Sequence, residues 1–170
     1  MSAARPAAFL DRDGVLNIDH GYVHRLADMD IVAGAGEAVR LLNEAGYLVI
    51  VVTNQSGVAR GLYGEKDVER FNGELAKRLG VHGARIDAFY HCPHHPEGSV
   101  ARYRIDCDCR KPKPGMLTQA ARDFAIDRSR SFLIGDRPGD SEAAAAFGIT
   151  GISFDVKTQS LVEVVRAALR

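Results

Sequence analysis

Residues 7–14 read AAFLDRDG, a short apolar run followed by an acidic turn. The apolar run predicts a buried strand, so Asp11 and Asp13 follow its carboxyl end. Ligands of open α/β sheets bind at that edge. Carboxylates on one tight turn can share a cation, or one can attack an electrophile while the other moves a proton. For this stretch taken alone, an ordinary solvated turn is the alternative.

Strand-like and helix-like patterns alternate along the rest of the chain. Apolar runs predict strands at 7–10, 47–52, 86–90, 131–134 and 149–154. Helical spacing of apolar residues predicts helices at 36–45, 65–79, 114–124, 143–147 and 161–169. The alternation predicts an α/β fold with a doubly wound, mostly parallel sheet and helices on both faces. We expect one domain over residues 1–170, because no linker or repeat interrupts the pattern, and no separate cap domain over the site.

Composition bounds the classes of partner. Lys+Arg and Asp+Glu are both 22, so the formal net charge is +0, which gives no support for a nucleic-acid or anionic-membrane partner. No segment approaches the ~20 apolar residues of a membrane span, and the N-terminus lacks an apolar signal core. The 3 cysteines lie close together, which argues against a disulfide framework. We expect a cytoplasmic monomer.

Three further polar clusters follow predicted strands or precede a helix. Hydroxyl and backbone N–H groups of residues 53–56 can hold phosphate oxygens. Lys111 can neutralise charge on a transferring phosphoryl group. Asp136 and Asp140 can complete an oxygen-ligated Mg²⁺ site. Taken singly, these clusters have plain alternatives: a polar turn, a solvated basic loop and a helix N-cap by Asp140.

Taken together, the clusters resemble a known family. DRDG at 11–14, a strand ending in Thr53, Lys111 before a helix and GDRPGD at 135–140 resemble the motifs of the haloacid-dehalogenase superfamily of aspartate-nucleophile phosphatases. The set stands in the family's order and covers most of the chain. The resemblance therefore implies a phosphatase of this superfamily.

The resemblance also implies a role for each motif. Asp11 would be the nucleophile, and Asp13 would protonate the leaving alcohol and then activate water. Thr53 and Lys111 would hold the phosphoryl oxygens. A catalytic Mg²⁺ would be bound by oxygen atoms of three acids: Asp11, Asp13 and Asp136. Asp140 would lie behind these ligands.

The cysteines form a second signal. Cys92, His94, Cys107 and Cys109 supply a Cys₃His set, which is typical of tetrahedral structural zinc. His95 is the alternative to His94 as the histidine ligand. The set leaves no open coordination position, so we expect Zn²⁺ to be structural. Free thiols beside a surface histidine are the alternative.

The loop around these cysteines narrows the family. CPHH at 92–95 with CDCRKPKPGM at 107–116 looks like the histidinol-phosphatase-related branch, which includes histidinol-phosphate phosphatases and heptose bisphosphate phosphatases. HHPEGSV at 94–100 and NIDHGY at 17–22 are similar to the heptose branch. That resemblance implies removal of the 7-phosphate from a heptose 1,7-bisphosphate. Arg137 departs from the lysine that is commoner at this place. A zinc-ribbon nucleic-acid module and a phospho-accepting signalling domain are the alternatives from other classes.

A site without a cap must bind a small substrate through its charges. The candidate contacts to the sugar phosphate are Asp19, His20, Gly21, Tyr22, Thr53, Asn54, Gln55, Ser56, Arg110, Lys111 and Arg137. Arginine suits bidentate phosphate contact, so Arg110 and Arg137 are the candidates for the distal phosphate.

Overall fold

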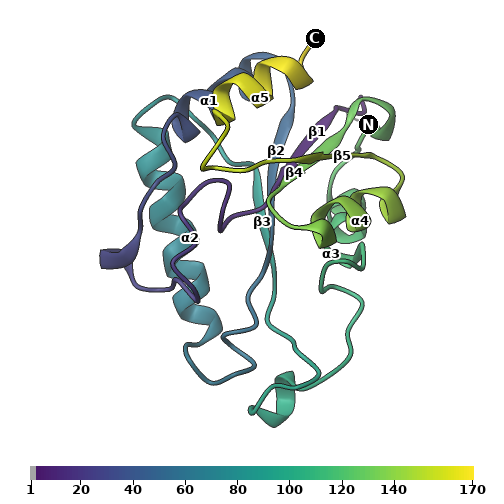
Figure 1. Ribbon diagram of the computed structural model, residues 1–170. Coiled ribbons are helices and arrows are strands. Elements are labelled where there is room, and N and C mark those ends of the chain that lie inside the picture. The colour runs from purple at the N-terminus through teal and green to yellow at the C-terminus, as the bar shows by residue number, and fades with distance from the viewer. Residues whose placement is uncertain (1–2) are drawn as a thin grey trace.

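The computed structural model describes residues 3–170. A parallel sheet of five strands forms its centre, in the order β3-β2-β1-β4-β5 (Figure 1). The strands are β1 (Ala7–Leu10), β2 (Leu48–Asn54), β3 (Ala88–Cys92), β4 (Phe132–Gly135) and β5 (Thr150–Ser153). The helices are α1 (Ala35–Glu44), α2 (Glu65–Gly80), α3 (Gly115–Asp123), α4 (Pro138–Phe147) and α5 (Leu161–Ala168). The predicted α/β fold is confirmed.

Helices cover both faces of the sheet, because β1 and β2 are apolar on both sides. Ala8 and Leu10 of β1 pack into one buried cluster with residues of α1, α2 and α5. Ala7 and Phe9 pack into a second cluster with residues of α3 and α4. Figure 1 shows these two layers of helices on either side of the strands. The continuous apolar runs are thus typical of parallel strands that are buried on both faces.

Some element bounds differ from the prediction. β2 continues through Thr53 and Asn54, and β3 continues to Cys92, because these polar residues still pair with the neighbouring strand. α4 begins at Pro138 instead of residue 143, since proline suits a first helical turn and Asp140 caps the helix through the Arg137 N–H. Hydrophobic periodicity does not register such polar ends.

The strand order places the acidic turn at the middle of the sheet. β1 lies between β2 and β4, with Leu10 in register with Val51 and Ile134. The chain moves to opposite sides of β1 in its two halves, which creates a switch point where such folds bind ligands. The polar residues that follow β1 and β4, and those that end β2, therefore share one edge. None of the helices within residues 3–170 is long and apolar enough to cross a membrane.

Candidate active site

A cavity of about 600 Å³ opens where these polar residues meet. Its volume lies within the range of about 300–1,000 Å³ that is usual for small-molecule sites. Most of its lining was predicted from the sequence: Asp11, Asp13, Asp19, Gly21, Tyr22, Thr53, Asn54, Gln55, Ser56, Arg110, Lys111, Arg137 and Asp140. Arg60, Tyr63, Pro138 and Gly139 also line it and were not predicted. The sequence motifs therefore converge on one cavity.

Lys111 joins two of the acids at the base of this cavity. Its Nζ donates to Asp11 Oδ1 at 3.0 Å, to Asp140 Oδ1 at 2.6 Å and to the Val52 carbonyl at 2.8 Å. All of these donors and acceptors are buried. Burial alone would lower the pKa of Lys111, but the Asp11 and Asp140 carboxylates raise it, so the amine stays charged.

Asp11, Asp136 and Asp140 each place a carboxylate oxygen within 4.8 Å of the others. Burial raises the pKa of Asp11 to about 8, and neighbouring carboxylates add to this effect while Lys111 opposes it. Burial likewise raises the pKa of Asp136, whose Oδ1 is buried without a hydrogen-bond partner among residues 3–170. Both oxygens of Asp140 already accept hydrogen bonds, from Lys111 and from the Arg137 N–H.

These acids fit a hard divalent cation. A cation beside Asp11 and Asp136 would relieve their repulsion and would give the buried Oδ1 of Asp136 a partner. Gly14 adopts φ +89°, and a Cβ at this position would collide with the Asp136 carboxylate. The glycine of the DRDG turn is therefore required for the close approach of Asp136. The donor set is the oxygen-only type that Mg²⁺ prefers.

The Asp13 carboxylate is held by four donors. Arg12 contacts both oxygens, with Nε 3.1 Å from Oδ1 and Nη2 3.3 Å from Oδ2. Asn17 Nδ2 donates to Oδ1 at 2.9 Å, and Gln55 Nε2 donates to Oδ2 at 3.0 Å. Arg12 is 0% exposed and lies 4.3 Å from the centre of the Phe71 ring. This arrangement fixes the rotamer of Asp13 at the edge of the cavity.

Gln55 connects Asp13 to Thr53. Its Nε2 also donates to Thr53 Oγ1 at 2.9 Å, while Tyr63 donates its hydroxyl proton to Gln55 Oε1 at 2.6 Å. Because Thr53 Oγ1 accepts from Gln55, its own hydroxyl proton is free for another acceptor. The Gln55 amide thus leaves Thr53 as a donor towards the cavity that it lines.

Three other predicted substrate contacts, Asn54, Arg137 and His20, form hydrogen bonds with other residues of the protein. Asn54 Nδ2 donates to the Lys111 carbonyl at 3.1 Å, and Asn54 Oδ1 accepts from the Lys111 N–H at 3.0 Å. Asn54 therefore holds the backbone of Lys111 against the end of β2. Arg137 Nη2 donates to Asp19 Oδ2 at 3.1 Å. His20 does not line the cavity, since its exposed ring faces Asp30 at 3.1 Å. Proximity in sequence to Asp19 does not indicate this side-chain direction.

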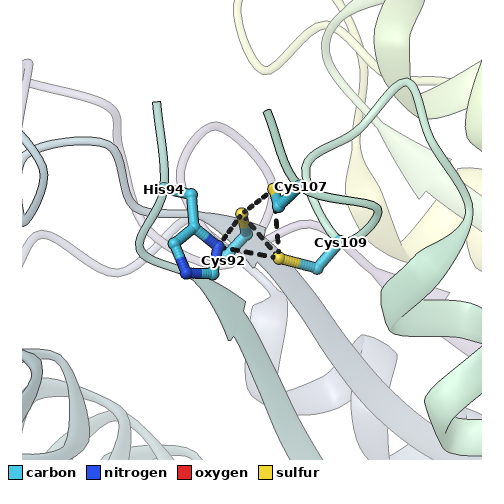
Figure 2. A group of neighbouring side chains, drawn as sticks. All are labelled: Cys92, His94, Cys107 and Cys109. Carbon is cyan, nitrogen blue, oxygen red and sulfur yellow. Dashed lines mark hydrogen bonds between the residues drawn. The ribbon is translucent and has the colours of Figure 1, made fainter. Parts of the chain in front are cut away.

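The predicted zinc ligands form a compact cluster outside this cavity (Figure 2). Cys92 Sγ lies 2.9 Å from Cys109 Sγ and 3.5 Å from Cys107 Sγ, and His94 Nδ1 lies 3.3 Å from Cys109 Sγ. Hydrogen bonds from Cys92, His94 and Cys107 lower the pKa of Cys109 to about 5, although burial opposes this. All cysteines are free of disulfides, and His94, not His95, faces them. The donor set fits a tetrahedral metal.

Known relatives identify the family. A protein from Rhodopseudomonas palustris named D-glycero-beta-D-manno-heptose-1,7-bisphosphate 7-phosphatase is 46% identical in an alignment that covers 97% of this chain and 95% of the relative. This chain belongs to the heptose-1,7-bisphosphate 7-phosphatase family. A relative of the same name from Vibrio cholerae is 42% identical over 98% of this chain and 94% of its own length. A family model described as HAD-hydrolase-like also matches residues 108–158.

Solved structures agree with the family. A D,D-heptose 1,7-bisphosphate phosphatase from B. bronchiseptica, complexed with magnesium and phosphate, superposes with a TM-score of 0.82 at 29% identity and covers 96% of this chain and 98% of its own. A HAD-like phosphatase from Mesorhizobium loti gives a TM-score of 0.88 at 32% identity, over 99% of this chain and 87% of its own. This chain therefore has the HAD fold.

Sequence reasoning missed three polar side chains at the site: Arg12, Arg60 and Tyr63. Arg12 interrupts the acidic turn and reads as a surface charge, whereas Phe71 and Asn72 of α2 surround it. Arg60 and Tyr63 follow the 53–56 cluster in a segment with no regular pattern. The nearness of this segment to the Thr53 motif was the one signal that pointed to them.

Proposed function

We propose that this chain hydrolyses D-glycero-β-D-manno-heptose 1,7-bisphosphate at the 7-phosphate and leaves the 1-phosphate in place. The observation that carries the proposal is the buried Asp11 carboxylate, which lines the cavity with the Lys111 ammonium 3.0 Å away. Close relatives that carry this activity in their names support the choice of substrate.

Asp11 is the nucleophile in this proposal. Both of its protein donors, the Arg12 N–H and Lys111 Nζ, bind Oδ1, so Oδ2 is the atom that attacks phosphorus. The bond from phosphorus to the sugar oxygen breaks as Asp13, protonated at this stage, gives that oxygen a proton and becomes a carboxylate. Asp13 then takes a proton from water, which attacks the aspartyl phosphate, releases inorganic phosphate and restores Asp11.

Positive charge and hydrogen-bond donors make attack by an anion on an anion feasible. Lys111 and the Thr53 hydroxyl bind the phosphoryl oxygens as charge develops in the transition state. Mg²⁺ would be held by Asp11, the Asp13 carbonyl and Asp136, and when bound it supplies Lewis-acid charge stabilisation. Asp140 keeps Lys111 in place from behind, at 2.6 Å.

The other metal has a structural role in this proposal. Zn²⁺ bound by Cys92, His94, Cys107 and Cys109 would tie residues 92–109 to the end of β3, because Cys92 is the last residue of that strand. Arg110, which follows the last cysteine, would then be positioned beside Lys111 to bind the distal phosphate. We further propose a single-domain, cytoplasmic, monomeric enzyme with no nucleic-acid or membrane partner.

A phosphate-release screen tests this function. Heptose 1,7-bisphosphate, histidinol phosphate and nucleotides are offered to the purified protein with and without Mg²⁺. The heptose bisphosphate should be hydrolysed fastest, only with Mg²⁺, and the product should carry phosphate at position 1. Faster hydrolysis of histidinol phosphate would instead assign the chain to the other activity of its branch.

A further inference from the structure

The cations around the cavity differ in whether an acid already neutralises them. Four cationic side chains line it: Arg60, Arg110, Lys111 and Arg137. Lys111 is paired with Asp11 and Asp140, and Arg137 is paired with Asp19. Within residues 3–170, neither Arg60 nor Arg110 forms an ion pair with an acid, and both are partly buried. The uncompensated positive charge of the cavity therefore belongs to these two arginines.

Both arginines also bury an N–H group that has no acceptor. Arg60 Nε and Arg110 Nη1 are each buried and unpartnered in the described part of the chain. A buried donor of a charged group without a partner is costly, so such groups are normally satisfied by a partner or a ligand. Two guanidinium groups that line one cavity with unused donors fit a dianion such as a phosphate group.

We propose that Arg60 joins Arg110 in binding the distal phosphate of the substrate, and that the segment 94–100 positions Arg60 for this contact. The first part rests on the proposed function, because it assigns the second phosphate of that substrate. The proposal leaves out Arg137, because its Nη2 already pairs with Asp19 at 3.1 Å.

The 94–100 segment packs directly on the turn that carries Arg60. The Val100 N–H donates to the Ala59 carbonyl at 2.9 Å. Gly98 lies so close that a Cβ there would be 2.7 Å from both the Cβ and the carbonyl oxygen of Ala59. Tyr22, in a neighbouring loop, also lies beside Arg60, with the centre of its ring 6.0 Å from the guanidinium carbon. Its φ of 50° is unusual for a residue other than glycine.

His95 of this segment places a further donor beside Arg60. Its Nδ1 accepts the Glu97 N–H at 3.0 Å, so the ring is the neutral tautomer that carries its proton on Nε2. That Nε2 lies 3.5 Å from Arg60 Nη2. Two facing donors need a common acceptor, which a phosphate oxygen supplies. His95 therefore leaves the Arg60 donors free for an anion.

The test compares two substrates across variants. For the bisphosphate and for p-nitrophenyl phosphate, kcat/KM is measured for the wild type, Arg60→Ala, Arg60→Lys and Gly98→Ala. Arg60→Ala should lower kcat/KM for the bisphosphate by about 10- to 100-fold, mostly through KM, as expected for one charge-assisted contact, and p-nitrophenyl phosphate by less than about threefold. Arg60→Lys should recover part of the loss.

Gly98→Ala tests the positioning role. The variant keeps every cation but displaces the turn at Ala59, so it should reduce kcat/KM for the bisphosphate selectively and add little to Arg60→Ala in the double variant. Melting temperature and zinc content show whether it remains folded. Arg25→Ala is the matched control, because Arg25 pairs with Asp28 outside the cavity; it should leave both substrates unchanged.

Binding of the product gives a readout apart from turnover. Calorimetric titration with heptose 1-phosphate should show a Kd at least about tenfold weaker for Arg60→Ala than for the wild type. Equal losses on both substrates, or an unchanged product Kd, would overturn the assignment of Arg60. If the wild type does not hydrolyse the heptose bisphosphate, the proposed function fails instead, and the same comparison on a sugar bisphosphate that it does hydrolyse still decides the role of Arg60.

Discussion

Buried charges hold the reacting groups in place at the scale of single residues. Asp11, Lys111 and Asp140 form one buried group, and the buried Arg12 pairs with the partly buried Asp13. The sequence predicted Asp11, Asp13 and Lys111 because strand ends and motif order mark them. It did not predict Arg12, since a charged residue in a turn is usually solvated and its burial depends on α2, which lies far away in sequence.

Gln55 gives the residue-scale prediction. Gln55→Glu keeps the shape of the side chain but removes both N–H donors, so Asp13 and Thr53 each lose a partner and a carboxylate faces Asp13. We expect kcat to fall on the order of 100-fold while KM changes little, because the loss of two positioned contacts acts on the chemical step. Steady-state kinetics with the heptose bisphosphate measures this split.

The control is Gln119→Glu, which introduces the same charge on the exposed side of α3 near Asp123. This variant should match the wild type in both constants. A similar kcat for Gln55→Glu and the wild type would show that the Gln55 amide does not position Asp13 or Thr53.

The loop of residues 92–109 links the two sites at the scale of secondary-structure elements. It leaves β3 at Cys92, packs through Val100 on the turn at Ala59, and returns at Cys109 just before Arg110 and Lys111. Spacing of cysteines alone predicted the cluster. The contact with the turn at Ala59 was not predictable, because it depends on a glycine whose close neighbour is distant in sequence.

Cys107→Ser tests the metal at this loop. Because metal binding to a structural site contributes folding free energy, the variant should lose zinc and melt at a lower temperature than the wild type. Elemental analysis of untagged protein expressed with zinc, together with calorimetry, measures both effects. Wild-type protein without zinc would contradict the assignment, as would a Cys107→Ser variant that keeps stoichiometric zinc and the wild-type melting temperature.

The whole molecule shows how much of the fold follows from pattern alone. The alternation of apolar runs and helical spacing predicted the five parallel strands and the helices on both faces, because β1 and β2 are apolar throughout. It did not predict that α4 begins at Pro138 or that β2 extends to Asn54. Those boundaries depend on polar capping and on strand pairing, which hydrophobic periodicity does not record.

Stability of the metal-free protein should depend on pH. The pKa of Asp11 is raised from 3.8 to about 8 in the folded state. The folded protein therefore binds this proton more tightly than the unfolded chain does, and the unfolding free energy falls as pH rises between these values. Mg²⁺ should offset this loss and raise the melting temperature more at pH 8 than at pH 5. Calorimetry with EDTA or with Mg²⁺ measures the difference.

Asp11→Asn is the matched variant for this prediction, since it cannot ionise. It should flatten the part of the pH dependence that the wild type shows between pH 5 and pH 8, and it should respond less to Mg²⁺. Identical pH profiles for the two metal-free proteins would remove Asp11 as the cause.

Trapping of the phosphorylated enzyme tests the central claim, that Asp11 forms an aspartyl phosphate. Wild-type protein with Mg²⁺ is mixed with heptose 1,7-bisphosphate labelled at the 7-phosphate and quenched in acid within milliseconds, and the peptide that contains Asp11 is analysed by mass spectrometry. The account predicts label on Asp11 in the wild type, none in Asp11→Asn, and no turnover by that variant. Full turnover by Asp11→Asn, or no label on Asp11 in wild-type protein that is quenched during turnover, would contradict it.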